Sequence, residues 1–179
     1  MIEARFTNKM KDILKSLKGC DFVGYSVTEF YEGKTVHDGK IYLHVADRII
    51  KIFNKGKQIP WFQTKDLSDL EEIFSFACAE TFEQGKQKNV VKETIKKVSI
   101  ITDYIKIPQE NYEIVLDMAV LIETEAHRYI ISRGWQFEEC LDMNIDKKYD
   151  EVYPVEQVVE EWNNFGEWKV NIKRDIEEL

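Results

Sequence analysis

One pattern occurs twice in the chain and constrains the fold more than any other feature. Residues 35–52 read TVHDGKIYLHVADRIIKI, and residues 114–132 read IVLDMAVLIETEAHRYIIS. Each stretch has an early Asp, alternating apolar residues, a short polar break and a second apolar run. Alternation of this kind is typical of half-buried strands, and the break between them predicts a hairpin. The two stretches align at an offset of 79 residues. This indicates an internal repeat, although any two half-buried hairpins also resemble each other.

A hairpin alone is only marginally stable, so each apolar face needs a cover. Three apolar stripes with helical spacing could supply it, over residues 2–17, 70–82 and 155–162. The second stripe is the most clearly marked, because Ser68 and Glu71 fit a capping box and Gly85 follows the stripe. We therefore predict an α+β fold: a mainly antiparallel sheet of two similar hairpin units, with helices packed on its apolar face.

The rest of the chain completes two halves. Residues 1–85 form the first α+β half and residues 86–179 the second, merged into one domain, which suits a chain of 179 residues. Further strands are expected over 22–27, 98–107, 137–145 and 168–172, with Pro108 ending the second of them. The polar segment 84–97 suggests a linker with a short helix, and the acidic end at 175–179 is expected to fray.

The sequence gives no sign of export or of a membrane span. Charges occur all along Met1 to Leu17, and the apolar runs are much shorter than the roughly 20 residues of a spanning helix. Cys20, Cys78 and Cys140 are widely spaced and odd in number, which fits reduced thiols. We expect a cytoplasmic protein.

No catalytic or cofactor motif was found. The Gly-x-Ser-x-Gly elbow, a glycine-rich phosphate loop and His-Glu-x-x-His are all missing from the sequence. Of the three histidines, His44 should project from the polar face of a strand and His127 should lie in the second turn, with His37 before the first hairpin. Either His44 or His127 could act with a nearby carboxylate, so a small hydrolase or transferase is the alternative function. No histidine pair has metal-ligand spacing, and we expect no metal or cofactor.

Charge is uneven along the chain. The formal net charge is −8; residues 1–100 contain 17 Lys and Arg against 14 Asp and Glu, whereas residues 101–179 contain 8 against 19. An acidic second half repels a phosphate backbone and attracts a basic protein. The simpler alternative is that the acids only keep the protein soluble.

Aromatic residues lie among these acids. Trp135 follows Arg133 in a predicted turn, and Trp61 lies in a loop, whereas Trp162 belongs to a helical stripe and should be core. Acids accelerate encounter with a basic partner and rings supply buried contact. We predict no catalytic residue and a partner-binding surface made of acids and aromatic residues, namely Glu123, Trp135, Glu138, Glu139, Asp142, Asp146, Tyr149, Asp150 and Glu151.

In size, acidity and lack of active-site motifs, the chain is similar to the immunity proteins with which bacteria neutralise toxins. The resemblance extends to no motif, residue by residue. It implies a non-catalytic binding module whose partner is a basic protein, such as a nuclease-type toxin domain. A third reading is a homo-oligomer that pairs through an exposed sheet edge.

Overall fold

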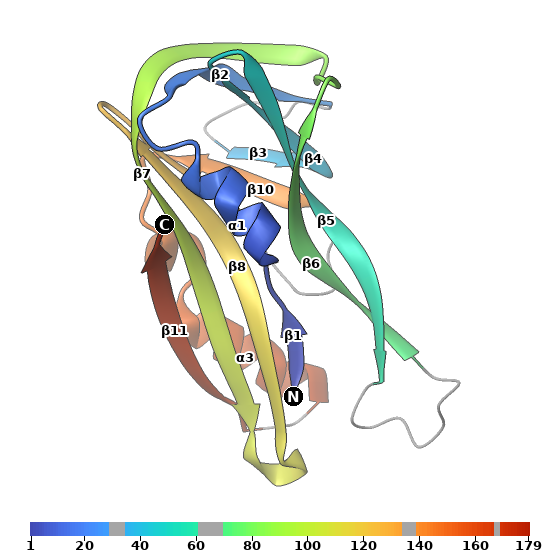
Figure 1. Cartoon of the computed structure of the whole chain (residues 1–179). Coiled ribbons are helices and arrows are strands. Elements are labelled where there is room, and N and C mark those ends of the chain that lie inside the picture. Colours follow the sequence, from blue (N-terminus) through green and yellow to red (C-terminus); the bar gives the residue numbers. More distant parts are fainter. Residues whose placement is uncertain (29–34, 61–69, 134–138, 167–168) are drawn as a thin grey trace.

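The computed structural model describes residues 1–28, 35–60, 70–133, 139–166 and 169–179 (Figure 1). Their fold is α+β and mostly antiparallel. The strands are β1 (Ile2–Ala4), β2 (Asp21–Val27), β3 (Thr35–Asp38), β4 (Lys40–Val45), β5 (Arg48–Pro60), β6 (Leu70–Thr81), β7 (Gln87–Ile107), β8 (Tyr112–Thr124), β9 (Arg128–Ser132), β10 (Leu141–Ile145) and β11 (Asn171–Glu178). The helices are α1 (Asn8–Lys15), α2 (Tyr149–Val152) and α3 (Val155–Gly166), with a short 3-10 turn η1 (Pro108–Glu110).

The strands follow the order β3-β10-β9-β8-β7-β2-β4-β5-β6, with β1 beside β8 and β11 beside β7. Only Gly39 separates β3 from β4 along the chain. These two strands are six places apart in the strand order, so the strands between them curve round until β3 and β4 come close. Two curved layers result, and Figure 1 shows β5 and β6 to the right of β8 and the long part of β7, with α1 between them in this view.

The long strand β7 passes from one layer to the other. Its first part pairs with β2, and its second part pairs with β8 and β11. The β2–β7 register shifts between Phe22 and Gly24, and Lys92 has a φ of 61°. A Cβ on Gly24 would lie 2.0 Å from the Asn89 carbonyl oxygen, so only glycine permits this approach. The predicted linker and helix at 84–97 are wrong, because from Gln87 onward the segment is a bent strand that both layers share.

Both predicted hairpins are present. In β4–β5, Ile41 pairs with Ile52, and in β8–β9, Val120 pairs with Ile131, so the two registers agree at the offset of 79. The loops also begin at equivalent places, Ala46–Asp47 in the first hairpin and Glu125–His127 in the second. The agreement concerns geometry; a duplication of the chain stays a prediction.

The predicted helix over 70–82 is wrong, because residues 70–81 form strand β6. Besides the apolar residues with helical spacing, the segment contains an equally good alternation of Phe74, Phe76 and Cys78. Strand β5 pairs with β6 along its whole length, and Phe76 and Cys78 are buried in the core. Long-range pairing therefore overrode the local pattern. The proposed cap at Ser68 lies outside the described residues.

Both ends of the chain also differ from the prediction. The helix begins at Asn8, where the Thr7 hydroxyl accepts a hydrogen bond from the Met10 N–H at 3.3 Å, while residues 2–4 pair in parallel with β8. The C-terminal acids do not fray from the sheet, since β11 extends to Glu178 and pairs with β7 throughout. The strands at 22–27 and 98–107 and the helix after Pro154 are confirmed.

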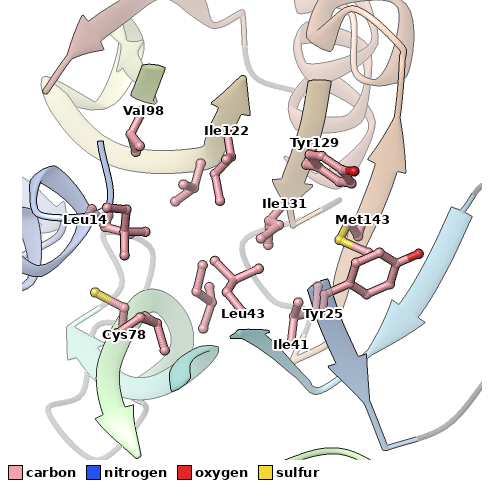
Figure 2. Close-up of a cluster of buried hydrophobic side chains, with 14 of the residues drawn as sticks. Leu14, Tyr25, Ile41, Leu43, Cys78, Val98, Ile122, Tyr129, Ile131 and Met143 are labelled. Carbon is pink, nitrogen blue, oxygen red and sulfur yellow. The ribbon is translucent and has the colours of Figure 1, made fainter. Parts of the chain in front are cut away.

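Two apolar clusters hold the layers together. The first lies between the two layers and is closed by Leu14 and Leu17 from the α1 region; Figure 2 shows Ile41, Leu43 and Ile131 converging within it. The second lies between the other face of β7–β8 and the helix α3, whose Trp162 is fully buried, as predicted.

The three cysteines are free thiols, and burial raises the pKa of the Cys78 thiol to about 12. No helix in the described ranges is long and apolar enough to cross a membrane.

Candidate functional site

The turn of the second hairpin carries the clearest group of polar side chains. The His127 ring lies between two carboxylates: Nδ1 is 2.9 Å from Asp146 Oδ2, and Nε2 is 3.6 Å from Glu93 Oε1. These acids come from β7 and from the residue after β10, so three separate segments meet at one ring. We call Glu93, Thr124, His127 and Asp146 the His127 cluster.

Backbone bonds hold the cluster in place. The Thr124 hydroxyl accepts the His127 N–H at 3.0 Å and also bonds Glu93. Asp146 accepts the Arg128 N–H at 3.2 Å, and its own N–H donates to the Arg128 carbonyl at 2.8 Å. Asp146 adopts a φ of 61°, a conformation that Asp tolerates better than most residues. Its carboxylate therefore has a structural role besides its charge.

Further acids surround the cluster. Glu123 pairs with Arg128 at 3.2 Å, and Glu125 pairs with Lys96 at 2.8 Å. A depression of about 320 Å³ lies among the turn residues, and a second of about 200 Å³ extends to Asp150; Glu123 and Arg128 line both. The predicted residues Glu123, Asp146 and Asp150 thus lie on one continuous surface. With Glu93, Glu125 and the adjacent Glu151, we call it the acidic surface.

Tyr149 lines the smaller depression beside Asp150, but most of its side chain is buried. It begins α2, is 5% exposed and packs in the second core cluster. The guanidinium of Arg174 lies 4.6 Å from its ring centroid, and burial raises the pKa of its hydroxyl far above the ordinary value. Arg174 also binds Asp103 through two bonds of 2.7 and 2.8 Å, and both of these side chains are buried.

The other predicted partner-binding residues lie elsewhere or outside the described ranges. Glu139 is exposed before β10, where its carbonyl accepts a hydrogen bond from Asn54, and Asp142 lies within β10 between β9 and β3. Neither lines the two depressions. Trp135, Glu138 and the loop residue Trp61 fall outside the described residues.

His44 is buried rather than on the polar face of a strand, which corrects the prediction. It is 6% exposed, and its Nε2 lies 2.7 Å from the Oγ of Ser26, which is also buried. The Gly85 N–H donates to the same hydroxyl at 3.0 Å. Burial, and secondarily Lys88, lowers the pKa of His44, so the neutral ring is favoured. This pair ties β2 to β4 and cannot meet a substrate while buried.

The folded structure reduces the charge asymmetry between the two parts of the chain, because it brings their opposite charges together. Bases of residues 1–100 pair with acids of residues 101–179: Arg5 with Asp117 at 3.4 Å, Lys18 with Glu178 at 3.2 Å, and Lys97 with Glu178 at 3.1 Å. The acids near the C-terminus are therefore partly neutralised. The acidic surface differs, because its carboxylates outnumber the basic side chains that pair with them.

Glu93, Thr124 and Glu125 belong to the site but not to the surface that we predicted. Glu93 lies in the segment that we interpreted as a linker, whereas Thr124 and Glu125 lie at the end of β8 and in the turn after it. Glu93 is 34 residues from His127. No local signal could have joined them, because the contact depends on the bend of β7.

The arrangement places one histidine ring between two carboxylates and presents negative charge. Among the described residues, no group of three or more His, Cys, Asp and Glu is placed to hold a metal ion.

The class that these observations define is an α+β protein of mostly antiparallel strands, with acids gathered at one hairpin end. Comparison of the chain with known family models, curated proteins and solved structures gave no match.

Proposed function

We propose that this protein is a non-catalytic binding module that uses the acidic surface to hold a basic protein, in the manner of a toxin-neutralising immunity protein. The partner would be a basic domain of the nuclease-toxin kind, while the surface would disfavour nucleic acid. The observation that carries the proposal is the continuity of Glu123, Asp146 and Asp150 across two adjoining depressions.

Shape and charge both support this use. The smaller depression is lined by apolar side chains as well as charged ones, including Leu121 and the exposed Ile176. Apolar contact at the centre of an acidic rim is the arrangement found in many protein interfaces. Each of the six acids already lies beside a basic side chain, so a basic partner would compete for them with residues such as Arg128 and Lys148. We therefore expect charge to contribute more to association rate than to affinity.

The test begins by capturing the partner from the native host and purifying it. Association would then be followed by stopped-flow fluorescence across a salt series, for wild type and for the double variant Glu123→Lys/Glu151→Lys. If the acidic surface steers binding, the association rate constant should fall by about tenfold at low salt and the difference should shrink as salt rises.

A matched control places the same charge change at the other end of β8. Glu110 and Glu113 lie at the β7–β8 turn, about 40 Å from the β8–β9 turn at roughly 3.3 Å per strand residue. Glu110→Lys/Glu113→Lys should leave the rate constant nearly unchanged. An equal loss in both variants would mean that only net charge matters, and no loss in either would contradict the proposal.

The alternative is a hydrolase or transferase with His127 as general base. Its support is that one half-exposed ring lies 2.9 Å from Asp146 and 3.6 Å from Glu93. Assays with an activated ester and an activated phosphodiester, on wild type and His127→Gln, separate the two functions. Turnover that His127→Gln abolishes favours the enzyme, whereas equal background rates in both proteins count against it.

A further inference from the structure

The strand β11 leaves one edge of the sheet open. Among the described strands it pairs with β7 alone, along its whole length and without a register shift. Figure 1 shows β11 at the outer side of the molecule, and within the described ranges no strand lies on its other side. Open edges of this length bind further strands unless something prevents it.

The backbone groups that face outward can be identified. The Leu179 N–H donates to the Val98 carbonyl at 3.0 Å, in continuation of the β11–β7 ladder. Because adjacent residues of a strand direct their backbone groups to opposite edges, residues 179, 177, 175, 173 and 171 bond to β7. Ile172, Arg174 and Ile176 therefore direct their N–H and C=O groups away from the protein.

The side chains along this edge are self-complementary. Lys173 and Asp175 lie on one face, where they form an ion pair of 2.9 Å and Lys173 sits over the Tyr104 ring. Ile172 and Ile176 lie on the opposite face; Ile172 packs against the second core cluster and Ile176 is 63% exposed. The Arg174 side chain is already held by Asp103 and brings no free charge to the edge.

We propose that two copies of this chain pair antiparallel through β11, about a two-fold axis at Arg174. Ile172 of one copy would then lie opposite Ile176 of the other, and Lys173 opposite Asp175. Each of the pairs 172–176, 174–174 and 176–172 can exchange both of its backbone hydrogen bonds.

The register is selected by charge. A shift that moves the axis to residue 173 places the two Lys173 side chains opposite each other, and a shift to residue 175 does the same for the two Asp175 side chains. Like charges directly opposite one another destabilise a strand pair. The axis at Arg174 avoids both and joins two pairs of opposite charge. An edge that carries only lysines repels a second copy of itself, whereas this edge carries both charges and can pair with one.

The first test uses sedimentation equilibrium of the full chain over a concentration series. Wild type should show a concentration-dependent dimer. Asp175→Lys places two lysine pairs across the axis and should weaken dimerisation by about tenfold or more. The swap Lys173→Asp/Asp175→Lys restores opposite charges and should restore the dimer. These side chains are exposed, so circular dichroism should show all variants folded.

A proline pair tests the backbone bonds. Ile176→Pro removes an N–H that faces outward, so the monomer should keep its melting temperature while the dimer is lost. Glu177→Pro removes an N–H that bonds β7 and should lower the melting temperature instead. A wild type that is monomeric at every concentration overturns the proposal, as does a dimer that Asp175→Lys leaves unchanged or that the swap fails to restore. Ile176 also lines the smaller depression, whereas Lys173 and Asp175 line neither depression. The charge variants, measured on the purified chain alone, therefore test the dimer separately from the proposed partner.

Discussion

The two hairpins have the same register and loop position, yet their outer faces have different environments. In β8–β9, Leu121 pairs with Ile130, and both are buried against the cluster that contains α3. At the equivalent places in β4–β5, Tyr42 pairs with Lys51, and Lys51 forms an ion pair with Glu83 at 2.9 Å. The two hairpins thus have the same backbone pairing, but their outer faces differ because a helix layer covers that of β8–β9.

Two buried aspartates show a similarity between the two repeated stretches. Asp38 and Asp117 occupy equivalent places at the offset of 79, and both are buried. Asp117 accepts the Phe6 N–H at 2.6 Å and the Thr102 hydroxyl at 2.7 Å, while Asp38 accepts the N–H and hydroxyl of Thr28. Here the roles agree, because each carboxylate satisfies the backbone of a neighbouring segment.

The strongest test of the outer faces exchanges their residues. Ile130→Lys would bury a charge in the second cluster and should lower the free energy of unfolding by about 5 kcal/mol. Lys51→Ile changes a partly exposed position and should alter it by less than about 1 kcal/mol. Urea denaturation measures both. Similar costs would show that the two faces are covered alike.

Arginines near the two hairpins should also differ in importance. Arg174→Met leaves Asp103 buried without its partner, so we expect a loss of about 3 kcal/mol. Arg48→Met breaks a surface pair with Glu80, 3.1 Å apart, and should cost about 0.5 kcal/mol. Thermal and urea unfolding should agree on this order, and the reverse order would contradict the burial of the Arg174–Asp103 pair.

His44 and Glu123 occupy equivalent places at the offset of 79, yet substitutions at the two positions should change the pH dependence of stability differently. Since the pKa of folded His44 lies below its ordinary value of 6.5, the unfolded chain takes up the proton first as pH falls. The contribution of His44 to stability is therefore complete above pH 6.5 and is lost as pH falls through the folded pKa. His44→Gln should flatten the stability profile below pH 6.5. Glu123→Gln, which affects an exposed pair, should leave that region unchanged.

The smallest effect concerns the loops. Ala46 has a φ of 51°, whereas no residue of the Glu125–His127 loop has a positive φ. Ala46→Gly should therefore raise the free energy of unfolding by about 0.5 kcal/mol, since glycine removes the strain. Ala126→Gly should bring no gain. A loss at Ala46 would mean that the greater freedom of glycine in the unfolded chain outweighs the relief of strain.

Prediction from sequence succeeded where the pattern had one interpretation. Alternation around Leu43 and Ile122 identified both hairpins, and Pro108 marked the end of a strand. It failed over 70–81, where the same apolar residues fit a helix and a strand, and pairing with β5 decided between them. For the candidate site, the acids Glu123, Asp146 and Asp150 were predicted, but the burial of Tyr149 and the approach of Glu93 were not.

The sequence by itself determined the local elements and the chemistry available to them: the alternating strands, the amphipathic helix around Trp162, and an excess of acids after residue 100. Only the tertiary structure decided which faces these elements bury and which charges meet. Side-chain periodicity is set within a few residues, whereas burial and ion pairing depend on segments that are distant in the chain. His127 shows the difference, since the sequence placed it in a turn and the bend of β7 supplied its second carboxylate.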